Sequence, residues 1–196
     1  MDAFVAIVQV LSAAARWTPS GLGPDAEQRG DDVKLYSQAQ FQCDPSVVAE
    51  VFASEAFLLR LRDVTQITQT VLDRREEGNL VIERINNVSS KELPGMMASA
   101  LGSKTLTYVQ VNRLDPTTHR LEWRVELPVM SDKVRIAGVT TAVASAGGCV
   151  RTVDGECTVK VPFVGGRIEK VIVGEFMKSY ERATEIARSL IRERLA

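Results

Sequence analysis

The stretch RIEKVIVGEFMKSYERATEIARSLIRERL, residues 167–195, carries the strongest pattern in the chain. Apolar side chains recur in it every three or four residues, which predicts one long amphipathic helix. The predicted apolar face consists of Ile168, Ile172, Phe176, Tyr180, Ala183, Ala187, Leu190 and Ile191. The opposite face carries Lys170, Gly174, Lys178, Glu181, Glu185, Arg188 and Arg192. A helix of this length needs a broad apolar surface to cover, and a sheet provides one.

The sequence before this helix predicts that sheet, because its periodicity is two. Alternation is cleanest over residues 119–127, where Leu121, Trp123, Val125 and Leu127 share one side. A strand with one apolar and one charged side has one buried face and one wet face. Strands are predicted at residues 33–42, 65–76, 80–89, 104–114, 119–127, 133–145 and 149–161, with a bulge at Asp154-Gly155.

Two short helices are predicted between the first and second strands. Asp44 followed by Pro45 is typical of a helix start and predicts a helix over residues 46–53. Ser54-Glu55 begins the second one, which we expect to reach Leu61.

The first thirty residues differ in composition from the rest. Residues 3–15 are apolar but follow Asp2 rather than Lys or Arg, so a short amphipathic helix that docks on the domain or a partner is favoured over a signal remnant. Residues 18–32 are rich in Gly and Pro, as linkers are. We therefore expect residues 1–31 to be an apolar segment plus linker, and residues 32–196 to be one folded domain.

Composition excludes several functional classes. The chain has 196 residues, a net charge of −1 and a pI of about 6.0, so a basic nucleic-acid footprint is absent. Its three cysteines do not form a disulfide framework and predict reduced thiols in a cytoplasmic protein. The single histidine, His119, follows a turn and is expected to be exposed, which disfavours a zinc site or a catalytic triad. We expect no cofactor.

Residues 160–170, KVPFVGGRIEK, lead into the long helix and carry a resemblance to a known family. Together with the order of elements, they resemble the START-like (SRPBCC) superfamily, and within it a bacterial family catalogued as domain of unknown function 2505. The resemblance implies an α+β helix-grip fold, in which a curved antiparallel sheet of about seven strands wraps around the C-terminal helix. It also implies a cavity between the two for a lipid or another apolar molecule, but no catalytic residue.

Aromatic side chains on the predicted inner faces are candidates for ligand contact. Trp and Tyr combine an apolar body with a polar group that orients a ligand. The candidates are Tyr108, Trp123, Ile172, Phe176 and Tyr180, and ordinary core packing is the alternative. Arg84, Asn86, Gln110 and Asn112 are candidate polar groups on the inner strand faces, although the pattern does not decide which parity of these strands points inward.

The start of the long helix is a second candidate site. Its free N–H groups and Arg167 suit a ligand carboxylate or phosphate, while Glu169 alternatively serves the helix dipole or a salt bridge. Glu169 lies at the edge of the apolar face, where a carboxylate facing a cavity acts as an acid or base.

The apolar loop of residues 91–103 contains Met96 and Met97. It predicts a lid over a cavity mouth or a tip that touches a membrane transiently, and the alternative is a short helix packed on the core.

Three functional hypotheses follow from the sequence. The first is binding or transport of a hydrophobic small molecule or lipid. The second is an enzyme resembling polyketide cyclases or hydrolases that uses a cavity carboxylate, and the third is a protein-interaction module without a ligand.

Overall fold

The computed structural model describes residues 33–93, 95, 98–99, 102–129, 131–163 and 165–195. The predicted apolar segment and linker at the N-terminus lie outside the described residues, as do Met96 and Met97. Within the described residues, the order of elements is one strand, two helices, six strands and one long helix, as the sequence predicts.

The strands form one antiparallel sheet in the order β1-β7-β6-β5-β4-β3-β2. The strands from β2 to β7 lie side by side in the order of the sequence. Strand β1 lies at the edge opposite β2, where it pairs with β7. Within the described residues the strands are Val33–Phe41 (β1), Ile67–Glu77 (β2), Leu80–Glu92 (β3), Thr105–Asp115 (β4), Arg120–Glu126 (β5), Val134–Ser145 (β6) and Gly148–Val159 (β7).

The two short helices are α1 (Pro45–Ala53) and α2 (Glu55–Thr65). Asp44 occupies the N-cap position of α1 and Pro45 is its first residue, while the Ser54 hydroxyl accepts a hydrogen bond from Phe57 N at the start of α2. Helix α2 continues one turn beyond the predicted end at Leu61, until Gln66 adopts a left-handed conformation. Residues 62–64, for which the sequence predicted no element, and Thr65, predicted as the first residue of a strand, are therefore helical.

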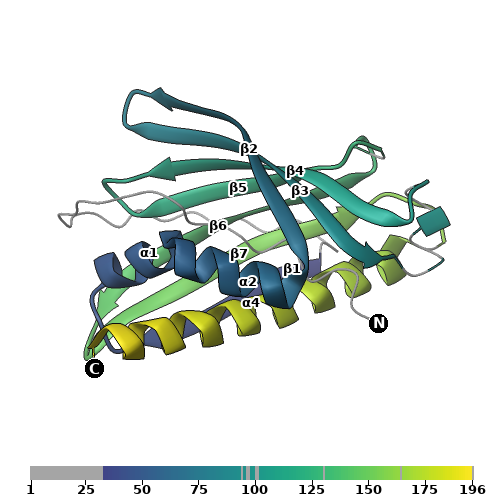
Figure 1. Ribbon diagram of the computed structural model, residues 1–196. Helices are drawn as coiled ribbons and strands as arrows, with labels where there is room; N and C mark the ends of the chain where they lie inside the picture. Colours follow the sequence, from purple (N-terminus) through teal and green to yellow (C-terminus); the bar gives the residue numbers. More distant parts are fainter. Residues whose placement is uncertain are drawn as a thin grey trace.

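The long helix α4 (Gly165–Leu195) lies on the concave side of the sheet together with α1 and α2 (Figure 1). It runs closest to β1 and β7, and α1 and α2 pack against it. Its predicted apolar face is buried, except for the partly exposed Leu190. None of the described helices has the length and apolar character needed to cross a bilayer.

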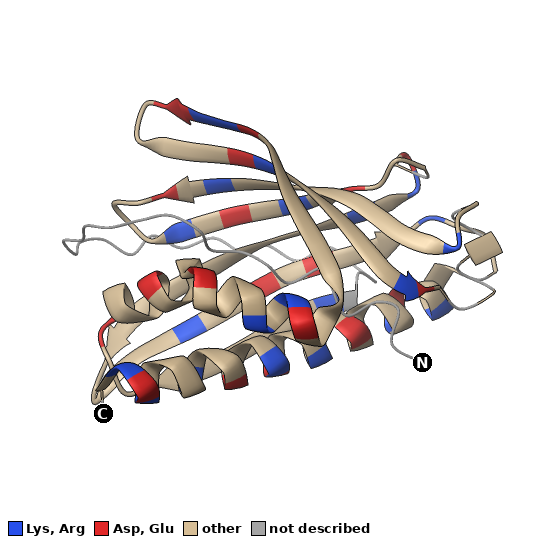
Figure 2. Ribbon diagram, viewed as in Figure 1, with Lys and Arg blue, Asp and Glu red and all other residues tan. Residues whose placement is uncertain are grey.

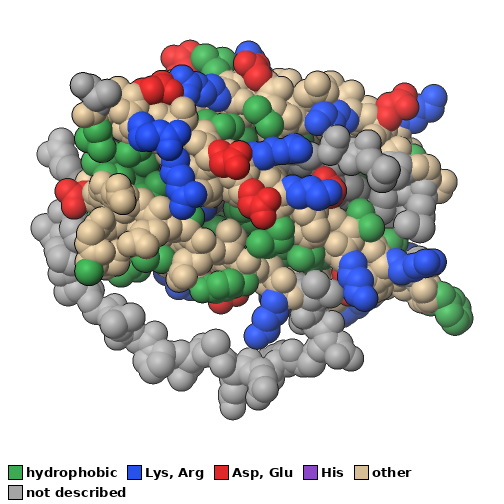
Figure 3. Space-filling view, turned by 90° about the horizontal axis from the view of Figure 1, so that it is seen from below, with side chains coloured by type: hydrophobic (Ala, Val, Ile, Leu, Met, Phe, Trp, Pro, Cys, Tyr) green, Lys and Arg blue, Asp and Glu red, His purple; other side chains and the backbone are tan. Residues whose placement is uncertain are grey.

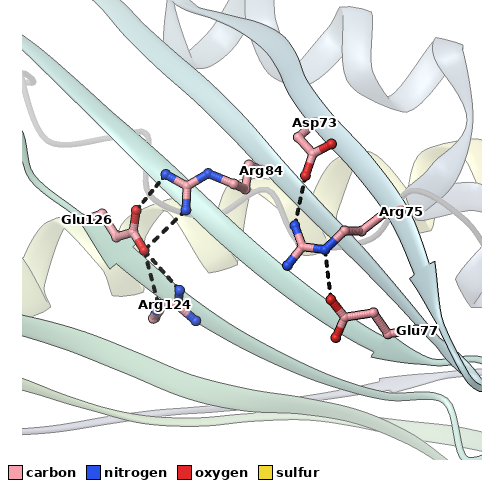
Figure 4. Close-up of polar contacts among 6 residues, drawn as sticks. All are labelled: Asp73, Arg75, Glu77, Arg84, Arg124 and Glu126. Carbon is pink, nitrogen blue, oxygen red and sulfur yellow. Dashed lines mark hydrogen bonds and ion pairs between the residues drawn. The ribbon is translucent and has the colours of Figure 1, made fainter.

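The convex side of the sheet is covered by charged side chains of both signs. Positive and negative side chains are interspersed along the strands and along α4 (Figure 2). Figure 3, which views the molecule from the side of α4, shows that both signs are also mixed on that face. Arg84 on β3 and Arg124 on β5 both donate to the Glu126 carboxylate, and Arg75 bridges Asp73 and Glu77 on β2 (Figure 4). This mixed charge is typical of solvated surface.

The structure corrects three expectations about strands and loops. Asp154-Gly155 forms no bulge, because β7 pairs without interruption with both β1 and β6. The register shifts instead in β2, between Val71 and Asp73, and in β3, between Val88 and Glu92. His119 is buried rather than exposed, in a left-handed conformation that turns the chain into β5. Arg84 and Asn86 point to the convex side, because the β3 residues opposite Gln110 and Asn112 are Ile85 and Glu83.

Candidate functional site

The interior beneath α4 is organised around Trp123 of β5. Trp123 pairs with Gly138 on β6, and Gly138 pairs with Gly155 on β7. A Cβ atom at Gly138 would lie 2.5 Å from Trp123 Cζ2, and one at Gly155 would lie 3.2 Å from Cη2. The two glycines therefore form a notch in which the indole ring lies across the sheet.

Aromatic rings of α4 cover this notch. Phe176 stacks on Trp123 with ring centroids 6.0 Å apart, and Tyr180, one turn later, lies 6.2 Å from Phe176. Tyr108 of β4 is fully buried on the same concave side. Burial raises the pKa of Tyr108 and Tyr180 above the ordinary phenol value, so both are neutral hydroxyls at pH 7 that can donate hydrogen bonds.

Three polar side chains form a diagonal across the concave side. Trp123 of β5 is paired with Gly138 of β6, and Thr140 lies two residues further along β6. Thr140 is in turn paired with Val153 of β7, and Arg151 lies two residues earlier on β7. Successive members are thus diagonal neighbours on one face of the sheet, within reach of long side chains. We call Trp123, Thr140 and Arg151 the polar diagonal.

Polar atoms in this region lack hydrogen-bond partners. Each side chain of the polar diagonal, and Tyr180 above it, is at most 3% exposed. Among the described residues, no partner is found for Trp123 Nε1, Thr140 Oγ1, Arg151 Nε or the Tyr180 hydroxyl. Buried polar atoms are nearly always paired with protein or water, so four unpaired atoms in one region indicate a place for something polar.

Arg151 is the unusual member of the polar diagonal. Its guanidinium lies 4.4 Å from the centre of the Phe52 ring of α1, and no ion pair connects it to any described carboxylate. Burial lowers the pKa of Arg151 to about 10, and the nearby Tyr180 opposes this change. Arg151 is therefore still a cation at pH 7, buried without a counter-charge from any residue that the structure describes.

The polar side chains Asn87, Glu83, Gln110 and Asn112 on β3 and β4 contrast with the polar diagonal, because each has a side-chain partner on β4 or on the neighbouring strand β2. Gln110 donates to Asn112 at 2.9 Å, and Asn87 accepts from Gln69 at 2.8 Å. Burial raises the pKa of Glu83, although its ion pair with Arg74 partly opposes this. Of the four polar candidates, Gln110 and Asn112 thus lie on the inner face, whereas Arg84 and Asn86 do not.

At the start of α4, the sequence candidates Arg167 and Glu169 lie apart from the aromatic side chains. Arg167 is exposed. Glu169 is buried, and its Oε1 accepts a hydrogen bond from Val159 N at the end of β7, 2.6 Å away. The Gly165 N–H donates to Val161 O at 2.9 Å. This geometry ties the beginning of the helix to the end of the last strand.

The structure thus brings Tyr108, Trp123, Ile172, Phe176 and Tyr180 into one buried region, and Met96 and Met97 fall outside the described residues. Sequence analysis missed Arg151, Thr140 and Phe52. A signal for Arg151 exists, because it is the one charged residue among the inward positions of β7, which are Cys149, Arg151, Val153, Gly155, Cys157 and Val159. Among the described residues there is no cluster of His, Cys, Asp and Glu that could hold a metal.

The curved antiparallel sheet and the long C-terminal helix on its concave side define a helix-grip protein. The family model described as "Protein of unknown function (DUF2505)" matches residues 37–191, and the chain belongs to that family. None of the curated proteins matches the chain in sequence.

Solved structures share the fold at low sequence identity. TTHA0849 from Thermus thermophilus has a TM-score of 0.59 and 13% identity, and the match covers 84% of this chain and 100% of that one. The Zhui aromatase/cyclase from Streptomyces sp. R1128 has a TM-score of 0.59 and 9% identity, with 85% and 97% covered. Protein Ms6760 from Mycobacterium smegmatis has a TM-score of 0.50 and 12% identity, with 87% and 98% covered.

Proposed function

We propose that the protein binds a hydrophobic small molecule, such as a lipid, between α4 and the concave side of the sheet. The observation that carries this proposal is the buried region around Trp123, where aromatic rings surround polar atoms that have no partner within the described residues. Binding sites for small molecules combine an apolar lining with a few polar groups that fix orientation. The shared fold with an aromatase/cyclase agrees with an apolar ligand.

Burial of apolar surface supplies the binding free energy, at roughly 25 cal/mol per Å² before ordering costs. Polar groups such as the Tyr180 hydroxyl and Trp123 Nε1 then select the orientation of the ligand. We also expect a cytoplasmic protein, since Cys43, Cys149 and Cys157 are not joined in disulfides, as is usual in a reducing compartment.

The enzyme hypothesis receives less support from the geometry. Glu169 is the carboxylate that the sequence suggested for acid or base chemistry. It accepts a hydrogen bond from the backbone N–H of Val159. Glu169→Gln keeps an oxygen acceptor for that N–H, whereas Glu169→Ala leaves the buried N–H unpaired, which costs about 1–3 kcal/mol. We therefore expect Glu169→Ala to lower stability and Glu169→Gln to change it little.

A neutral fluorescent probe, Nile red, tests the proposal directly. The wild-type chain should bind it, and Phe176→Ala and Tyr180→Ala should each weaken binding by roughly tenfold or more, the equivalent of about 1.4 kcal/mol of lost contact. Val171→Ala is the matched control, because Val171 lies on the same helix but is exposed.

Circular dichroism must show that both variants remain folded at the assay temperature. Absence of Nile red binding by the wild-type chain, or unchanged binding by both folded variants, would contradict a ligand beneath α4.

A further inference from the structure

Hydrophobic binding alone does not account for Arg151. A cation that is only 3% exposed normally has a carboxylate partner, because desolvating a charge without compensation is unfavourable. The nearest compensation for Arg151 within the described residues is the face of the Phe52 ring, which attracts the cation but brings no negative charge to balance it.

Carboxylates buried near the concave side are engaged elsewhere. Glu83 pairs with Arg74 at 3.0 Å, and Glu169 accepts from Val159 N at 2.6 Å. Glu175 pairs with Lys178 at 2.7 Å through Oε1, while its buried Oε2 has no partner among the described residues. The described titratable group that acts on the pKa of Arg151 is Tyr180, not one of these carboxylates. The positive charge of Arg151 is therefore not neutralised by any described side chain.

The unpaired polar groups near Arg151 are Thr140, its diagonal neighbour on β6, and Tyr180 of α4. Arginine Nε is a donor only, and the hydroxyls of Thr140 and Tyr180 can each turn a proton toward an acceptor. Unpaired donors around one cation, with no described carboxylate paired to it, are the arrangement expected of a receptor for an anion.

We propose that the ligand is an amphipathic monoanion, a carboxylate on an apolar body, whose anionic group pairs with Arg151 and accepts hydrogen bonds from the hydroxyls of Thr140 and Tyr180. This proposal rests on the proposed function and specifies its ligand class. A guanidinium matches a planar carboxylate with two parallel hydrogen bonds. A phosphate monoester would bring a charge of about −1.5 to −2 at pH 7, and one buried guanidinium would leave part of it unpaired.

Dodecanoate and dodecanol test this proposal as a matched pair, because they differ only in the polar end. Each is titrated against the full chain carrying Nile red, and displacement of the probe is measured. We expect dodecanoate to displace the probe at roughly 10- to 100-fold lower concentration than dodecanol, the range expected for a hydrogen bond to a charged group.

Variants of Arg151 assign the preference to this side chain. Arg151→Met removes the charge and keeps an unbranched apolar chain, so the two ligands should become equivalent to within about threefold. Arg151→Lys keeps the charge but loses the two-pronged geometry, so an intermediate preference is expected. Arg135→Met is the matched control, because the Arg135 side chain is 75% exposed on β6, and it should leave the preference unchanged.

The two proposals fail in different ways. Nile red binding with equal displacement by dodecanoate and dodecanol would overturn the carboxylate proposal and leave hydrophobic binding intact. A preference for dodecanoate that survives in Arg151→Met would also overturn it. Because the comparison of ligands on the wild-type chain needs no variant, it decides the question even if Arg151→Met does not fold.

Discussion

At the scale of single residues, His119 makes the stability of the protein depend on pH. It is buried, and burial lowers its pKa below the ordinary value of about 6.5, although Asp115 opposes the shift. The folded state thus prefers the neutral imidazole, so the contribution of His119 is fully present above pH 6.5 and is lost as pH falls through the lowered pKa.

His119→Asn should remove this dependence. Asparagine tolerates the left-handed conformation that His119 adopts and does not titrate. We expect wild type to lose stability relative to His119→Asn below pH 6.5, by up to about 1.4 kcal/mol per pH unit, in urea unfolding measured between pH 5 and 7. Parallel stability curves for the two proteins would show that His119 does not titrate with folding.

Arg151 should destabilise the protein when no ligand is bound. Arg151→Met removes a desolvated charge at the cost of the contact with Phe52, and we expect a net gain of about 1 kcal/mol in the free energy of unfolding. In a chain of this size that raises the melting temperature by roughly 2–4 °C. Arg135→Met should change it by less than about 0.5 kcal/mol. A large loss in Arg151→Met would instead give Arg151 a structural role.

At the scale of elements, the pairing of β6 with β7 shapes the interior through two glycines. Gly138→Ala would place a methyl group against Trp123 and against the backbone of Asp154 and Gly155, so we expect a loss of about 1–3 kcal/mol. Gly174→Ala is the control, since Gly174 lies within α4 with nothing near its Cβ position, and alanine there should add about 0.5–1 kcal/mol. Thermal unfolding measures the change in stability of each variant. Equal changes in Gly138→Ala and Gly174→Ala would mean that the packing of Trp123 does not require glycine at position 138.

The same elements show how far sequence patterns reach. Apolar residues recur every three or four positions in α4 and at every second position in β5, because each element buries one face. The helix, the strands and their order could therefore be predicted from the sequence. The bulge in β2 and the inward parity of β3 depend on pairing between strands, which no local pattern specifies.

Arg151 illustrates the limit for the candidate site. In the sequence it is one arginine in a strand of mixed composition. Only the register of β7 with β6, and the position of α1 above it, make it a buried cation beside Thr140 and Phe52. The aromatic candidates were easier to predict, because large rings on apolar faces are buried in almost any arrangement of these elements.

At the scale of the whole molecule, the two sides of the sheet differ in how their charged side chains are paired. The convex side pairs its arginines with carboxylates at the surface, as Arg84 and Arg124 do with Glu126, whereas the described part of the concave side holds Arg151 without a counter-charge. Exposed ion pairs contribute about 0–1 kcal/mol each and are screened by salt, so the convex side is best explained as a solvated surface.

Ligand binding on the concave side should therefore stabilise the elements that contact the ligand more than the other elements. A ligand at about 100 times its dissociation constant adds about 2.7 kcal/mol to the free energy of unfolding, which raises the melting temperature by roughly 5–10 °C. We expect dodecanoate to produce this shift in wild type and to slow hydrogen exchange in α4 and β5 to β7, which contribute Tyr180 and the polar diagonal. The hairpin of β2 and β3 should gain least, because its polar groups pair with one another. Equal protection of every element would indicate general stabilisation of the fold, and protection confined to the hairpin would place the ligand away from Arg151.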